Sequence, residues 1–160
     1  MKDNIIIYTD GGCRGNPGVG AWASILISEK YNLRLEIGES EKMTTNNKME
    51  MKAVIKALER LKNSHNIKVY SDSAYLVNGM NGWIYTWQKN NWIKSDKKPV
   101  ENKEYWLKLI ELSKKHNIEF IKVKGHSDNK ENNRADEIVN ILMDEHKNTG
   151  NIASFYNKIN

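Results

Sequence analysis

The sequence predicts a mixed α/β fold in which a three-strand antiparallel meander is followed by two strand–helix–strand crossovers. Short β-branched runs with brief connections occupy the first 40 residues. An amphipathic helical pattern begins near Asn47, and strand-like and helical segments alternate after it. The order βββαβαβα implies a mixed five-stranded sheet, a meander plus two parallel strands, with helices on its faces.

The three strands of the meander differ in pattern. Residues 5–9 form an apolar, β-branched run, and residues 19–28 (VGAWASILIS) are again strand-like. Residues 33–37 (LRLEI) alternate apolar and charged side chains, which is typical of a strand with one buried face. Their short connections favour antiparallel neighbours.

The later elements follow from helical spacing and from short apolar runs. The first helix carries an apolar stripe opposite charged residues, formed by Val54, Ala57, Leu58 and Leu61. A strand at 67–71 ends at Asp72, and a short helix begins at Ser73. A second amphipathic helix follows Pro99, a strand covers 118–123, and a last helix carries the stripe Ala135, Ile138, Val139, Leu142 and Met143.

Length and composition predict one domain over residues 1–146 and a polar tail, 147–160, whose order the sequence leaves open. The chain has 160 residues, is 39% hydrophobic and contains two prolines. No apolar run approaches the ~20 residues of a membrane span, and an acid interrupts the N-terminus too early for a secretory signal. We therefore expect a cytoplasmic monomer without membrane contact. The single cysteine, Cys13, cannot form an internal disulfide, and the net charge of +5 is compatible with polyanionic partners.

Four carboxylates occupy positions that suit a shared site, although each has a structural explanation when taken singly. Asp10 and Asp72 end predicted strands, where ligands of open α/β sheets bind, but aspartate at a strand end also forms turns. Glu50 lies three residues after Asn47 and can act as a helix cap. Asp136 lies at the edge of the apolar stripe of the last helix, where a fully solvated position is less expected.

Convergence of these four acids would imply bound metal. Clustered carboxylates repel one another and raise their pKa values unless cations neutralise them. Oxygen ligands select hard divalent ions such as Mg²⁺, and four carboxylates suit two ions. In a two-metal site one ion activates water and the other stabilises the leaving oxygen, which indicates phosphodiester hydrolysis.

The glycine-rich stretch YTDGGCRGNPGVG, residues 8–20, does not match a nucleotide-binding loop. Gly20 is followed by Ala21 and Trp22 in place of the Lys-Ser/Thr of a P-loop, and no helix follows. The G-x-G-x-x-G spacing of a dinucleotide site is also absent from the sequence. The stretch is predicted to be a tight turn that leaves clearance beside Asp10 for a bulky substrate.

Five segments in order resemble the type 1 ribonuclease H family, over about residues 5–143. They are YTDGGCRGNPGVGAWA, TTNNKMEMKAVIKALE, VYSDSAYLVNG, WIYTWQKNNWIKSDKKPVEN and VKGHSDNKENNRADE. The resemblance implies a ribonuclease H-like sheet flanked by helices, and it places metal-binding acids at Asp10, Glu50, Asp72 and Asp136. It also implies dependence on Mg²⁺ or Mn²⁺, with two ions in the presence of substrate. The implied reaction is endonucleolytic cleavage of the RNA strand of RNA–DNA hybrids, which leaves 5′-phosphate and 3′-hydroxyl ends.

The same resemblance assigns further residues. His126, in VKGH, is implied to be catalytic, and an imidazole with a pKa near ~6.5 suits proton transfer. Asn16, Thr45 and Asn46 are implied to contact substrate, because recognition of a hybrid uses sugar and backbone more than base identity. A basic handle at about residues 80–100 is implied to grip the phosphate backbone through Trp83, Trp87, Lys89, Trp92, Lys94, Lys97 and Lys98.

Some positions depart from the family pattern, and two other functions remain open. Met43 and Ala74 stand where relatives often have a basic residue and a glutamine, and Gln88 and Asn90 dilute the charge of the handle. The alternatives are a non-catalytic nucleic-acid-binding module and a ribonuclease H-like fold that acts on DNA. The sequence assigns no role to Arg14.

Overall fold

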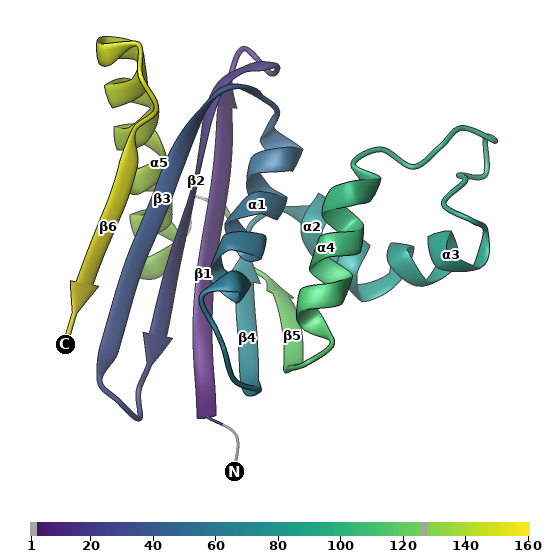
Figure 1. Cartoon of the computed structure of the whole chain (residues 1–160), viewed down its shortest axis with the longest axis horizontal. Coiled ribbons are helices and arrows are strands. Elements are labelled where there is room, and N and C mark those ends of the chain that lie inside the picture. Colours follow the sequence, from purple (N-terminus) through teal and green to yellow (C-terminus); the bar gives the residue numbers. More distant parts are fainter. Residues whose placement is uncertain (1–2, 126–127) are drawn as a thin grey trace.

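The computed structural model describes residues 3–125 and 128–160 and shows one mixed sheet with helices on both faces (Figure 1). The sheet has six strands in the order β5-β4-β1-β2-β3-β6. Their bounds are β1 Asp3–Arg14, β2 Gly18–Ser28, β3 Leu33–Thr44, β4 His65–Ser71, β5 Asn117–Lys122 and β6 Ser154–Ile159. β1, β2 and β3 form the antiparallel meander, while β4 and β5 run parallel to β1. The predicted fold class is confirmed.

Helices cover the two faces of the sheet unequally. The helical elements are α1 Asn46–Glu59, α2 Ala74–Asn78, a π-helical turn η1 Gly79–Trp83, α3 Ile84–Lys89, α4 Lys103–Ser113 and α5 Lys130–Thr149. α1 packs on one face, with α4 beside it, and α5 packs on the opposite face over β1, β2 and β3 (Figure 1). Each face has its own apolar core, centred on α1 and on α5 respectively.

β1 is longer than its apolar run predicts, because its glycines belong to the strand. Gly11 pairs with Trp22 and Gly12 with Ala21, so the turn between β1 and β2 is confined to residues 15–17. A Cβ on Gly11 would lie 2.4 Å from the backbone nitrogen of Glu50. This glycine therefore allows α1 to approach β1 closely, a role that differs from the predicted clearance for substrate.

The sheet contains a sixth strand that the sequence analysis missed. β6 pairs antiparallel with β3 from Ser154 opposite Glu39 to Ile159 opposite Arg34. The segment SFYNKI carries one partly buried aromatic residue and mostly exposed side chains, so its hydropathy lacks a clear strand pattern. β6 is held in place by backbone hydrogen bonds to β3 and not by burial of apolar side chains. The C-terminal tail thus extends the sheet.

The helices of the described residues include no candidate membrane span. The longest, α5, has 20 residues and carries charged side chains along its exposed side.

Candidate active site

Carboxylates from three separate elements meet at one end of the central strands. Asp72 directly follows β4, as predicted, and Glu50 projects from α1. Asp10 lies within β1, which continues to Arg14, so the prediction that Asp10 ends its strand is wrong. β1 and β4 are parallel neighbours, with Thr9 opposite Ser71. The residues that follow this pair, Asp10 and Asp72, therefore lie side by side at the same end of the two strands. One ligand oxygen from each of the three acids lies within 4.8 Å of the other two. The structure therefore brings these three predicted residues together.

Glu50 does not cap the helix that carries it. The N-cap of α1 is Thr45, whose Oγ1 accepts a hydrogen bond from the backbone N–H of Lys48 at 3.2 Å. The capping interpretation, which takes Asn47 as the N-cap, is therefore wrong. Glu50 is 8% exposed, and its Oε1 lies buried without a hydrogen-bond partner among the described residues. A buried carboxylate oxygen left unpaired in this way is suited to bind a cation.

Asp136, on α5, completes the rim of the same site from the other face of the sheet. Its carboxylate acts on Asp10 and helps to raise the pKa of that residue. An open hollow of about 470 Å³ joins all four carboxylates and is lined by Asp10, Gly11, Gly12, Cys13, Arg14, Asn46, Glu50, Asp72, Asp136, Val139, Asn140 and Met143. The hollow opens to the surface of the protein.

Burial and mutual repulsion raise the pKa values of the inner carboxyls, which favours their protonated forms. Burial raises the pKa of Asp10 to about 8, aided by the charges of Asp72 and Asp136, while the backbone N–H of Gly11 opposes the rise. Burial also raises the pKa of Glu50 well above its usual range, again with the help of Asp10 and Asp72. A divalent cation would replace these protons, and the all-oxygen donor set fits a hard ion such as Mg²⁺.

The predicted catalytic histidine, His126, lies outside the described residues. The residue before it, Gly125, passes against Asp72, since a Cβ there would lie 3.3 Å from Asp72 Oδ2. Gly125 thus borders the acid cluster.

The predicted polar contact residues line one wall beside the hollow. Asn16, in the β1–β2 turn, accepts a hydrogen bond through Oδ1 from the backbone N–H of Asn46 at 3.0 Å. Asn46 begins α1 and lines the hollow, while the Thr45 hydroxyl is engaged in capping. The turn and the helix start are therefore tied together next to the acids.

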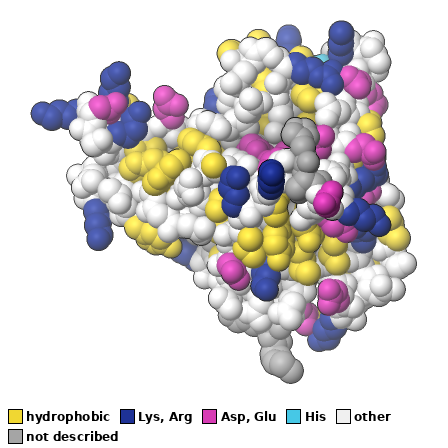
Figure 2. Space-filling view, turned by 180° about the vertical axis from the view of Figure 1, so that it is seen from behind, with side chains coloured by type: hydrophobic (Ala, Val, Ile, Leu, Met, Phe, Trp, Pro, Cys, Tyr) yellow, Lys and Arg dark blue, Asp and Glu magenta, His cyan; other side chains and the backbone are white. Residues whose placement is uncertain are grey.

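The handle, about residues 80–100, has packed aromatic side chains where it joins the body of the protein and lysines at its tip. Trp87 packs against Trp83, Trp92 and Trp106, with ring centroids 5.8, 6.0 and 5.5 Å apart. These rings attach α3 to the rest of the protein. Figure 2 shows the handle projecting from the body, with cationic side chains at its tip. The lysines of the handle are exposed at Lys89, Lys97 and Lys98, whereas Lys94 is half-buried and lies 4.0 Å from Asp96.

Sequence reasoning left two hollow-lining polar residues without a role. Arg14 lies on the same face of β1 as Asp10, because side chains alternate along a strand. Asn140 lies one helical turn after Asp136, and its Nδ2 donates to the Asp136 carbonyl oxygen at 3.0 Å. Both periodicities were present in the sequence and could have placed these residues in the site.

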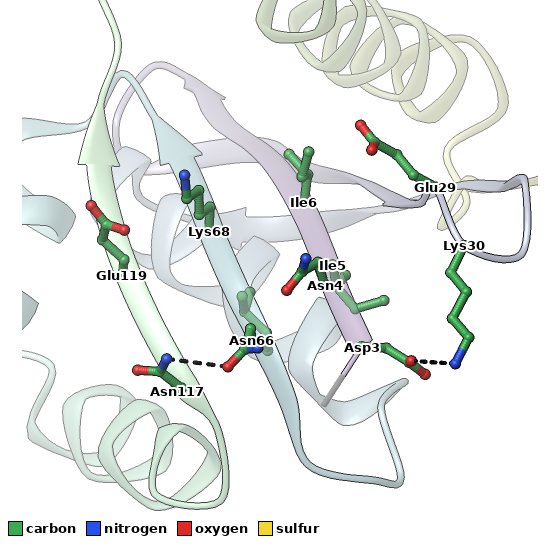
Figure 3. A pocket seen from close by; sticks show the side chains of 11 residues that line it. Asp3, Asn4, Ile5, Ile6, Glu29, Lys30, Asn66, Lys68, Asn117 and Glu119 are labelled. Atoms are coloured by element: carbon green, nitrogen blue, oxygen red, sulfur yellow. Dashed lines mark hydrogen bonds and ion pairs between the residues drawn. The ribbon is translucent and has the colours of Figure 1, made fainter. Parts of the chain in front are cut away.

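A second hollow lies at the opposite end of β1 and is lined by other groups (Figure 3). Its polar contacts are an ion pair between Lys30 and Asp3 at 3.0 Å and a hydrogen bond from Asn117 Nδ2 to Asn66 Oδ1 at 3.1 Å. Among its described lining residues the acids are dispersed and form no metal-binding group. It therefore makes a poorer site for phosphoryl chemistry.

Comparison with known proteins gives a consistent result. The family model described as RNase H matches residues 2–142. The ribonuclease H of Caldanaerobacter subterraneus subsp. tengcongensis is 52% identical over 150 residues, which cover 91% of this chain and 97% of that protein. The ribonuclease H of Chlorobaculum parvum is 51% identical, covering 91% of this chain and 99% of that protein.

Solved structures agree with the fold. LC11-RNase H1 in complex with an RNA/DNA hybrid superposes with a TM-score of 0.68 at 31% identity, covering 89% of this chain and 99% of that one. LC9-RNase H1, a type 1 RNase H with the type 2 active-site motif, gives a TM-score of 0.82 at 23% identity, covering 97% and 79%, and shows the fold alone.

The fold, the acid cluster and these likenesses together define a nuclease of the hydrolase class. More specifically, the chain belongs to the ribonuclease H family. The family predicted from the sequence is confirmed.

Proposed function

We propose that this protein is an endonuclease that hydrolyses the RNA strand of RNA–DNA hybrids and leaves 5′-phosphate and 3′-hydroxyl ends. The observation that carries the proposal is the convergence of Asp10, Glu50 and Asp72, whose ligand oxygens lie within 4.8 Å of one another in the lining of an open hollow. Its relatives are named ribonuclease H, and the similar LC11-RNase H1 has been solved with an RNA/DNA hybrid.

Asp10, Glu50, Asp72 and Asp136 would hold two Mg²⁺ ions, or Mn²⁺ in their place, when substrate is bound. Bound ions of this kind activate a water and stabilise the leaving oxygen of an in-line displacement. The chain supplies the anionic oxygens for this chemistry. Asp10 interacts with both Asp72 and Asp136, so it would stand at the centre of the carboxylate set that holds the metal. Metal binding requires ionised carboxylates, so the raised pKa values of Asp10 and Glu50 link metal affinity to pH.

The remaining predicted residues would position the hybrid. Asn16, Thr45 and Asn46 offer uncharged donors and acceptors for the sugar edge of the minor groove. The handle would bind the phosphate backbone with its lysines and place the aromatic faces of Trp83, Trp87 and Trp92 beside it. His126 would move a proton at the reacting water or at the leaving oxygen.

One experiment separates this function from its rivals. A hybrid, a double-stranded RNA and a double-stranded DNA of one sequence, each end-labelled, are incubated with the protein with and without Mg²⁺. We expect internal cleavage of the RNA strand of the hybrid alone, with Mg²⁺ required. Cleavage of DNA would indicate a DNA-acting enzyme, and binding without any Mg²⁺-dependent product would indicate a non-catalytic module.

The chemistry of the ends is read on the same products. Ligation of a 3′ adaptor to the 5′-labelled product without prior phosphatase treatment requires a 3′-hydroxyl, and degradation of the 3′-labelled product by a 5′-phosphate-dependent exonuclease reports a 5′-phosphate. Products that resist ligation until they are dephosphorylated would contradict the proposed end chemistry.

A further inference from the structure

Arg14 joins the end of β1 to α5 at the mouth of the hollow. Its Nη1 donates to Asp144 Oδ1 at 2.6 Å, and its Nη2 donates to Asn140 Oδ1 at 3.4 Å. Asn140 in turn donates to the carbonyl oxygen of Asp136 at 3.0 Å. These contacts fix the direction of the guanidinium, and they need two of its five N–H donors.

The charge of Arg14 contrasts with the rest of the hollow. Of the described residues that line it, Arg14 is the one with a positive charge, whereas four are acidic residues. A nucleic-acid strand that enters the hollow brings phosphates past this guanidinium, and arginine forms paired hydrogen bonds to phosphate oxygens. The charge and geometry of Arg14 therefore suit a phosphate.

A purely structural role explains Arg14 less well. Its side chain is 43% exposed and that of Asp144 is 62% exposed. Ion pairs with this exposure contribute little to folding, because water screens the charges and both side chains lose freedom. The ion pair therefore contributes little to holding β1 and α5 together, but it still orients the guanidinium over the hollow.

We propose that Arg14 is an additional substrate-binding residue, which contacts a backbone phosphate next to the one that is cleaved. Asn140 orients the guanidinium, and Asp144 competes with the phosphate for it. Asp144 follows Asp136 by eight residues, or about 12 Å along a helix, which favours a neighbouring phosphate over the reacting one. The inference rests on the proposed function of the hollow.

The test compares two variants that remove one positive charge. Arg14→Ala removes the proposed contact, and Lys30→Ala removes a cation of another exposed ion pair at the far end of the sheet (Figure 3). We expect Arg14→Ala to raise KM for a labelled hybrid about fivefold, with little change in kcat. This factor corresponds to the largest free energy that is usual for one exposed ion pair. The slope of log KM against log salt should fall by about 0.7–0.9, as for one lost phosphate contact. Lys30→Ala should change neither, and Arg14→Lys should recover part of the loss.

Asp144→Asn is expected to change KM in the opposite direction to Arg14→Ala. It frees Arg14 from a competing carboxylate, so KM should fall, and the fall should disappear in the double variant Arg14→Ala/Asp144→Asn. If the ion pair between Arg14 and Asp144 served only to hold β1 and α5 together, Arg14→Ala and Asp144→Asn would both raise KM and lower Tm. That result would overturn the inference. An Arg14→Ala KM and salt slope equal to those of Lys30→Ala would overturn it as well.

Binding separates this inference from the proposed function. Fluorescence anisotropy with a labelled hybrid is measured in an Asp10→Asn background, where no cleavage is expected. Loss of affinity on Arg14→Ala supports the phosphate contact whether or not the parent protein cleaves hybrid. Unchanged affinity refutes the contact, whereas failure of the parent protein to cleave hybrid refutes the proposed function.

Discussion

Replacing Asp10 with asparagine is expected to stabilise the metal-free protein at neutral pH while abolishing its activity. The folded protein holds the Asp10 pKa at about 8, against 3.8 in an unconstrained chain, chiefly through burial and the charges of Asp72 and Asp136. Folding is therefore disfavoured over the pH range in which the unfolded chain has released this proton and the folded protein has not. Asparagine has a similar shape and no charge, so it avoids this cost.

The size of the effect follows from linkage. Each pH unit between 3.8 and the working pH contributes about 1.4 kcal/mol, so the cost reaches about 4 kcal/mol at pH 7. The buried amide must still leave water, so we expect a net gain of about 2 kcal/mol, or roughly 6 °C in Tm for a chain of this size. The gain is absent below pH 4, where both states are protonated, and grows until pH 8.

The assay is thermal unfolding followed by circular dichroism, in EDTA, at pH 3, 5, 7 and 8. Glu119→Gln, an exposed acid on β5, is the matched control and should show no comparable rise. Adding Mg²⁺ should stabilise the parent protein and leave Asp10→Asn nearly unchanged. An Asp10→Asn variant that is no more stable than the parent at pH 8, or that gains equally at pH 3, would refute the electrostatic account of the site.

Three further predictions concern activity and packing. Asp72→Asn should reduce cleavage of hybrid by at least about 10³-fold without loss of the folded circular dichroism spectrum, and substantial remaining activity would count against a metal site. The double variant Lys97→Ala/Lys98→Ala should raise KM and reduce its salt dependence by up to two phosphate contacts; an unchanged salt slope would remove the handle from the substrate interface. Gly11→Ala should lower stability by about 1–3 kcal/mol in denaturant unfolding and lower kcat, because its Cβ would lie 2.4 Å from the Glu50 nitrogen; a neutral result would show that α1 can shift without displacing Glu50.

The sequence was sufficient for elements that bury an apolar face. The stripe of α1 and the apolar runs of β1 and β4 predict their own burial, and all three lie in the core. β6 could not be predicted in this way, because it is ordered by backbone pairing with β3 and by the contacts of Ala153 with Ser40. Edge strands of this kind leave little trace in hydropathy.

The site was partly predictable for a related reason. The parallel pairing of β1 with β4 ends at Thr9 and Ser71, so topology alone places Asp10 and Asp72 together, although β1 itself continues to Arg14. The position of Glu50 depends on how closely α1 approaches Gly11, which is a packing distance that no spacing rule supplies. The contacts of Arg14 depend on the register between β1 and the C-terminal half of α5, which is again a property of the folded protein.

The most direct test of the central claim is cleavage of a uniform hybrid in which only the RNA strand is labelled, at fixed Mg²⁺, by the parent protein and by Asp10→Asn. We expect internal RNA products with 3′-hydroxyl ends from the parent protein and none from the variant. Equal product from both proteins, or cleavage that persists in EDTA, would contradict it.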